Sequence, residues 1–219
     1  MIKDLLELYS RHKAIIYETG ERCNADMAGP FFVSPNDVYW RAEVKIVFVG
    51  QETNEWSSEC DIVAQMDTYR RFNLGEAYYS SPFWNVIRKF EIALAKSALS
   101  SAWLNLNRYD QEGGRPSWDN QLILSELDFL LTEELKLLAP NIVIFFTGPH
   151  YDERLVNLMK ADCTSINNFP SRQLCKIQSD EIEALIFRTY HPKYLRLSGL
   201  EAGVIETICK ESSYIITQS

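Results

Sequence analysis

Four short segments carry the residues whose types and spacing could do chemistry, and the first is Gly50-Gln51-Glu52. It follows 44–49, a mostly apolar, β-branched run that is typical of a buried strand. A glycine at the end of a strand lets the backbone turn sharply and approach a ligand. A carboxylate two residues later could act as a general base or position a water molecule. The alternative for Glu52 is an ordinary solvent-exposed side chain beside a tight turn.

The second segment, 103–109, has the alternation of a strand. It places Asn105 and Asn107 on one face and Leu104 and Leu106 on the other. A buried asparagine within an apolar strand must satisfy its amide group. It can do so by capping a neighbouring loop or by pairing with the amide edge of a ligand, and both interpretations stay open for Asn105.

The third segment contains His191, which follows the strand-like run 184–189 and precedes Pro192. The proline ring restricts the backbone and fixes the turn. An imidazole held at the end of a strand can act as an acid or stabilise negative charge, and the alternative is a structural histidine. The other histidines, His12 and His150, fall on a predicted exposed helix and a loop, so they are not assigned to the site.

The fourth segment, 78–84, gathers aromatic residues in front of a predicted helix. Tyr79 and Phe83 could stack on a nucleobase. Phe83 and Trp84 could equally belong to the hydrophobic core.

The elements that must position these segments alternate between strand and helix along the chain. This alternation predicts an α/β fold, a three-layer α/β/α sandwich with a mainly parallel central sheet. In such a fold, ligands bind where loops leave the carboxyl ends of strands. The expected strands are 44–49, 102–107, 141–147, 174–177 and 184–189, and the expected helices are 4–19, 61–72, 82–99, 118–138, 151–160 and 200–215.

Length and composition fit one domain of ordinary globular character. The 219 residues are 46% hydrophobic and 24% charged, which excludes a disordered or collagen-like chain. We expect a single domain over 1–219, with an N-terminal helix and ordered loop in 1–43, a motif-bearing core in 44–196 and a C-terminal helix in 197–219. The net charge of −8 argues against a surface coated with nucleic-acid-binding charge but leaves room for a local basic cleft.

The five cysteines are odd in number and scattered, without a CxxC pair. We therefore expect free thiols in a reducing cytoplasm and neither a zinc site nor a disulfide scaffold. The first residues mix charged and apolar types, unlike a signal peptide, and no apolar run approaches the roughly 18 residues that span a bilayer. The sequence thus predicts a cytoplasmic protein without membrane association.

Taken in order, the four segments resemble the uracil-DNA glycosylase superfamily. In one branch of that family the first strand ends in a water-activating loop, Gly-Gln-Asp-Pro-Tyr-His, and Gly50-Gln51-Glu52 is similar to its first half with Glu for Asp. The family's closing motif in the iron–sulfur branch, His-Pro-Ala-Tyr-Leu-Leu-Arg, is similar to 191–196, which reads His-Pro-Lys-Tyr-Leu-Arg. The resemblance covers 44–196 and implies a glycosylase-type α/β/α sandwich.

The activity that the resemblance implies is hydrolysis of the bond between a base and its sugar in DNA, with uracil as the default base. Glu52 would orient the water and offset the positive charge of the sugar. His191, with backbone N–H groups near Gln51, would stabilise negative charge on O2 of the departing base. Gly50 and Gln51 would lie against the base itself.

The same resemblance assigns the groups that bind the DNA. Asn105 would pair with the N3–H and O4 edge of uracil, and either Phe83 or Tyr79 would stack on the base once it has left the helix. The implied partner is single- or double-stranded DNA that contains a modified base. The basic residues implied to contact phosphates are Arg108, Lys193 and Arg196.

Several departures from the family pattern keep other functions open. Thr53-Asn54-Glu55 replaces Pro-Tyr-His, and the cysteines do not match the iron–sulfur ligands, so no cofactor is predicted. One alternative is a catalytically inactive or repurposed member that binds a nucleobase or nucleotide. The other is a protein-interaction domain on the same scaffold, which the acidic net charge favours.

Overall fold

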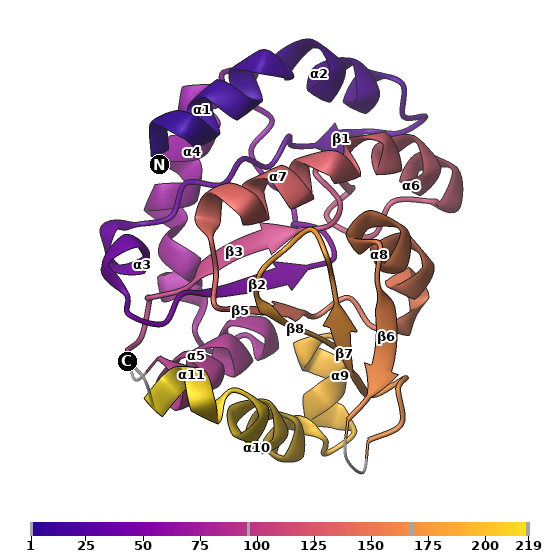
Figure 1. Ribbon diagram of the computed structural model, residues 1–219. Coiled ribbons are helices and arrows are strands. Elements are labelled where there is room, and N and C mark those ends of the chain that lie inside the picture. Colours follow the sequence, from indigo (N-terminus) through magenta and orange to yellow (C-terminus); the bar gives the residue numbers. More distant parts are fainter. Residues whose placement is uncertain (1, 96, 167–168, 218–219) are drawn as a thin grey trace.

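A six-stranded sheet lies at the centre of the computed structural model, which describes residues 2–95, 97–166 and 169–217 (Figure 1). Its strand order is β3-β2-β5-β8-β7-β6. The first four strands in this order are parallel, and β7 and β6 are antiparallel to their neighbours. The predicted α/β fold with a mainly parallel sheet is confirmed. The strands are β2 (Ile46–Gly50), β3 (Ala102–Asn105), β5 (Ile142–Phe145), β6 (Asp162–Ser165), β7 (Leu174–Gln178) and β8 (Leu185–Thr189).

Helices cover both faces of the sheet. In Figure 1, α1, α2 and α7 lie above the sheet, and α5, α9, α10 and α11 lie below it. The layers form because every residue of β2, β3, β5 and β8 is buried, so both faces of these strands need an apolar cover. The helices are α1 (Ile2–Arg11), α2 (Lys13–Glu21), α3 (Asp37–Arg41), α4 (Ile62–Phe72), α5 (Pro82–Leu94), α6 (Trp118–Leu124), α7 (Asp128–Leu138), α8 (Asp152–Met159), α9 (Pro192–Leu197), α10 (Glu201–Glu211) and α11 (Ser213–Thr217).

Two helices that the sequence predicts as continuous are broken. The expected helix 4–19 divides at His12 into α1 and α2, and 118–138 divides into α6, a 3-10 turn (Ser125–Leu127) and α7. At the second break the Ser125 hydroxyl donates a hydrogen bond of 2.7 Å to the Leu122 carbonyl. A serine side chain competes in this way with the backbone hydrogen bonds of a helix.

Two pieces of β structure lie outside the predicted strands. The edge strand β6 escapes prediction because its residues, Asp162 to Ser165, are polar and mostly exposed and show no apolar alternation. A separate two-stranded sheet joins β1 (Met27–Ala28) to β4 (Asp110–Gln111). It ties the N-terminal ordered loop to the segment after β3, and Phe31, Phe32 and Val33 of that loop are fully buried.

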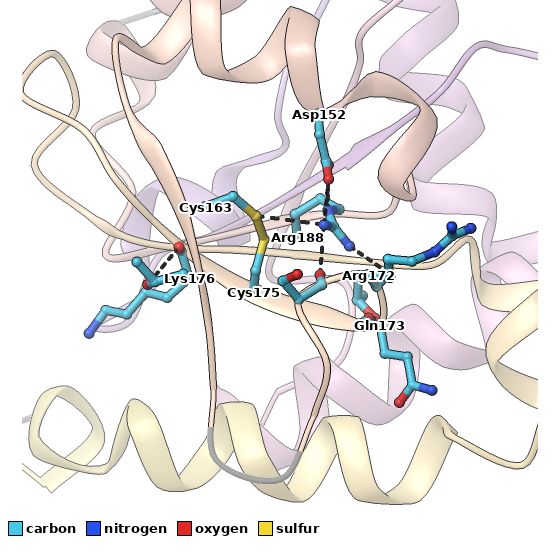
Figure 2. Close-up of a disulfide and its surroundings, with 10 residues drawn as sticks. Asp152, Cys163, Arg172, Gln173, Cys175, Lys176 and Arg188 are labelled. Carbon is cyan, nitrogen blue, oxygen red and sulfur yellow. Dashed lines mark hydrogen bonds and ion pairs between the residues drawn. A yellow bond between two sulfur atoms is a disulfide. The ribbon is translucent and has the colours of Figure 1, made fainter.

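The expectation of free thiols throughout is wrong for one pair of cysteines. Cys163 on β6 and Cys175 on β7 form a disulfide, with their Cα atoms 5.7 Å apart (Figure 2). The sequence could not show this pair because the two residues become neighbours only when β6 pairs with β7. The other three cysteines, Cys23, Cys60 and Cys209, are free thiols.

A buried arginine organises the turn beside this disulfide. Arg188 on β8 forms an ion pair with Asp152 and donates to the carbonyl oxygens of Ser171 and Arg172 at 2.8 and 2.9 Å (Figure 2). These bonds fix the backbone from which the Arg172 side chain projects. No helix in the described part of the chain is long and apolar enough to cross a membrane.

Candidate functional site

The carboxyl ends of β2 and β5 meet at a point where the chain connections diverge. From β2 the chain continues to β3 on one side, whereas β8, the strand that follows β5 within the parallel part of the sheet, lies on the other side. Such switch points leave a crevice in which ligands bind. The Gln51 amide closes the base of the crevice by donating to the Thr147 carbonyl at 2.7 Å.

A pocket of about 730 Å³ opens beside this point and is called the aromatic pocket here. Its volume is within the range of small-molecule sites. The pocket is lined by the loop after β2, by the start of α5 and by His191, which follows β8. The sequence singled out residues in all three segments. Its wall carries six rings, those of Trp56, Phe72, Tyr78, Phe83, Trp84 and Trp103, together with the ionisable side chains of Glu52, Glu55 and His191.

Glu52 is held at the wall of this pocket by a chain of polar contacts. Its Oε2 accepts a hydrogen bond of 3.2 Å from Asn107 Nδ2, and the Oδ1 of Asn107 accepts one of 2.7 Å from Arg154. Burial raises the pKa of Glu52 above its ordinary value, and the hydrogen bond from Asn107 and the charge of Arg115 limit the increase. Asn107 was singled out in the sequence only for its strand face, and it is the residue that orients the carboxylate.

His191 lies on the same wall as a neutral imidazole. Its Nδ1 accepts a hydrogen bond of 3.2 Å from the backbone N–H of Lys193, so the ring proton is on Nε2. The ring is partly stacked on Phe83, with 5.6 Å between centroids. Burial first, and then the positive charges of Lys193 and Arg115, lower the pKa of His191 to about 4.

We therefore expect the His191 imidazole to show no proton uptake at neutral pH. In an NMR titration its ring signals should move near pH 4, well below the ordinary histidine value of about 6.5. Because the unfolded chain takes up this proton at higher pH than the folded one, the residue's contribution to stability is complete above about 6.5 and is lost as pH falls toward 4. A ring that titrates at the ordinary histidine value would contradict this assignment.

Asn105 lies at the same edge of the sheet but behind the wall of the pocket. It is fully buried, and its Oδ1 accepts a hydrogen bond of 3.2 Å from Trp103 Nε1. Its Nδ2 has no hydrogen-bond partner among the described residues. Gly50 packs so closely that a Cβ atom there would lie 2.3 Å from Asn105 Oδ1. The structure thus brings Glu52 and His191 to one wall and places Asn105 one layer deeper.

The two candidate stacking residues differ in position. Phe83 is part of the wall, whereas Tyr79 is 66% exposed and does not line the pocket. The tyrosine that reaches the wall is its neighbour Tyr78. Trp103, two residues before Asn105 on β3, also lines the pocket and donates to the asparagine.

Arg108, implied by the resemblance to bind phosphate, is wrongly assigned. Its side chain is 1% exposed and forms an ion pair with Glu134 of α7. Arg108 Nη1 is 2.7 Å from Glu134 Oε1, the same oxygen that the Tyr9 hydroxyl reaches at 2.5 Å. Arg108 is therefore a structural residue, because burial closes it to any phosphate.

A second pocket, of about 440 Å³, adjoins the first and shares Gln51 and His191 with it. We call it the cationic pocket, because none of its lining residues is acidic and its basic lining residues are Arg115, His150, Arg172 and Lys193. Lys193 lines this pocket, whereas Arg196 lines neither pocket and lies 3.9 Å from Glu201. Arg115 and Arg172 escaped the sequence analysis because neither adjoins a recognised motif.

Within the described residues, no group of three or more histidine, cysteine, aspartate and glutamate side chains is placed to hold a metal ion. A comparison of the sequence with models of protein families and another with curated proteins both find no match.

Proposed function

We propose that this protein is a DNA glycosylase of the uracil-DNA glycosylase type, which hydrolyses the N-glycosidic bond of uracil or a related damaged base. The observation that carries the proposal is the placement of the Glu52 carboxylate and the neutral His191 imidazole on the wall of one aromatic pocket. A carboxylate and a hydrogen-bond donor beside stacked rings are the groups that this reaction needs.

In the proposed reaction the bond between sugar C1′ and the base nitrogen breaks as water adds to C1′. Its electron pair leaves with the base, so negative charge collects on O2 of uracil. The Nε2–H of His191 donates to that oxygen, and Glu52 faces the positive sugar and takes a proton from the attacking water. A neutral histidine suits this role because its proton is available for donation without being lost to the base.

The buried amide of Asn105 supports the same proposal. A buried N–H group without a partner is rare, and it costs free energy unless a ligand satisfies it. The O4 atom of uracil is an acceptor that fits Asn105 Nδ2. Asn105 is fully buried and does not line the pocket, so this contact requires the wall to adjust.

The cationic pocket gives the DNA backbone a path beside the base. We expect Arg172→Gln and Lys193→Gln each to weaken binding of a single-stranded oligonucleotide and to reduce the salt slope by about one. Arg196→Gln removes the same charge outside both pockets and is the matched control. Fluorescence anisotropy over a series of salt concentrations measures the effect. Absence of DNA binding at low salt would favour a protein-interaction domain instead.

The direct test is release of the base from an oligonucleotide that contains one uracil, detected as an alkali-labile site in the strand. Release is the expected result. No release from uracil or from other deaminated or alkylated bases, together with measurable binding of free uracil, would assign the pocket to a nucleobase-binding protein without hydrolysis.

A further inference from the structure

The two adjoining pockets carry charges of opposite sign. The cationic pocket has basic lining residues and no acidic ones. The aromatic pocket has two carboxylates on its wall, those of Glu52 and Glu55, and neither lysine nor arginine. Arg115 is on the cationic side, where it donates to Gln51 at 2.8 Å and lies over the Tyr151 ring. Arg71 lines neither pocket but donates to the hydroxyl of Thr68, a lining residue of the aromatic pocket, at 3.0 Å.

A third carboxylate lies directly behind the acidic part of the aromatic pocket. Asp110 is fully buried and accepts hydrogen bonds from the Thr53 hydroxyl and from the backbone N–H groups of Glu55, Trp56 and Gly113. It forms no ion pair with any residue that the structure describes. Asp110 therefore holds the loop that carries Glu55 and adds a negative charge behind it, while the charge of Arg115 acts on Glu52 from the cationic side.

Tryptophan and other aromatic faces attract cations, and the attraction increases when water is excluded. Aromatic rings combined with carboxylates are a common way to recognise a positively charged organic group. Within the described residues, Lys13 lies over the Tyr17 ring and Arg115 over the Tyr151 ring, and neither ring belongs to the aromatic pocket. None of the pocket's rings is therefore occupied by one of these two cations.

We propose that the aromatic pocket selects a nucleobase that carries a positive charge, namely an N-alkylated purine, over its neutral counterparts. The inference rests on the proposed function and names the substrate class. A neutral pyrimidine such as uracil gains stacking in this pocket but makes no use of the unpaired carboxylates, whereas a cationic ring gains from both.

The chemistry of such a base suits the residues present. When the glycosidic bond of an N-alkylated purine breaks, the electron pair of the bond neutralises the positive ring, which leaves as a neutral purine. Water supplies the hydroxyl group to C1′, and its proton passes to Glu52 and then to solvent. The step balances without an oxidant, a metal or a second substrate.

The test compares two isomers of the same mass and nearly the same shape. 1-Methyladenosine is cationic at neutral pH, and N6-methyladenosine is neutral. Binding to the full chain is followed by quenching of tryptophan fluorescence, since three tryptophans line the pocket. We expect the cationic isomer to bind about tenfold more tightly, which corresponds to about 1.4 kcal/mol.

Glu55→Gln and Glu59→Gln provide a matched pair of variants. Both remove one charge from exposed positions in the same segment, but only Glu55 lines the pocket. We expect the preference for the cationic isomer to fall about fivefold in Glu55→Gln, since one charge at short range in a wet site contributes about 1 kcal/mol. The preference should be retained in Glu59→Gln.

Equal binding of the isomers, no binding of either, or equal losses in the two variants would overturn the charge preference. Uracil release is scored separately, so a glycosylase without this preference is recognised by release from uracil DNA with equal isomer binding. The reverse result, a preference without release from any base, would retain the pocket assignment and reject hydrolysis.

Discussion

Replacement of Glu52 by glutamine should reduce base release by about 100- to 1,000-fold, the typical cost of removing one preorganised electrostatic group. The substitution keeps the shape of the side chain, and its new amide can still contact the Asn107 side chain. It removes the negative charge that faces the sugar and the group that takes the proton from water. Single-turnover release from an oligonucleotide measures the loss, and binding of the same oligonucleotide should change far less.

The pH dependence of base release by the unaltered protein is a second test of the role of Glu52. Glu52 must be ionised to act, and burial raises its pKa. The rate should therefore decrease as pH falls, beginning above the pH range in which an ordinary glutamate takes up its proton. Glu59→Gln is the control, since Glu59 is exposed and lies outside the pocket. Wild-type rates in Glu52→Gln would show that the chemistry is assigned to the wrong carboxylate.

The positions of Glu52 and His191 could be predicted because both follow buried parallel strands. Hydrophobic runs fix those strands, and parallel strands bring their carboxyl ends to one edge. The depth of a side chain at that edge is not encoded in the same way. Asn105 alternates correctly along its strand, yet it is fully buried and bonded to Trp103, which lines the pocket where Asn105 does not.

The positions of the charged side chains were the least predictable part of the site. Arg115 and Arg172 reach the cationic pocket from loops, and their positions depend on contacts between distant segments. For Arg172 these contacts include the hydrogen bonds from Arg188 to the backbone at 171–172. No local sequence pattern predicts these bonds. Arg108 shows the opposite error, because an arginine near a predicted site invites a functional interpretation, while its partner Glu134 is on a helix 26 residues away.

Replacement of Arg108 by methionine should destabilise the fold by about 3–5 kcal/mol, because it leaves the buried carboxylate of Glu134 without its counter-ion. Methionine approximates the length of the arginine stem, so the change tests charge pairing more than volume. Glu134 would keep the hydrogen bond from Tyr9 at 2.5 Å, which does not neutralise it. Urea unfolding followed by circular dichroism measures the loss, with the slope of the transition checked for constancy.

Two further variants separate the ion pair from general effects of an arginine substitution. Arg22→Met breaks an exposed ion pair with Glu126, in which Arg22 Nη1 is 2.7 Å from Oε2, and should cost far less stability because solvent screens the pair. Arg108→Met combined with Glu134→Leu removes both buried charges and should recover most of the stability, because an apolar pair does not need to be neutralised. If the double variant is as unstable as Arg108→Met alone, the loss comes from packing. If Arg108→Met folds with unchanged stability but binds DNA poorly, the result would support phosphate binding by Arg108 and contradict the structural role assigned to it.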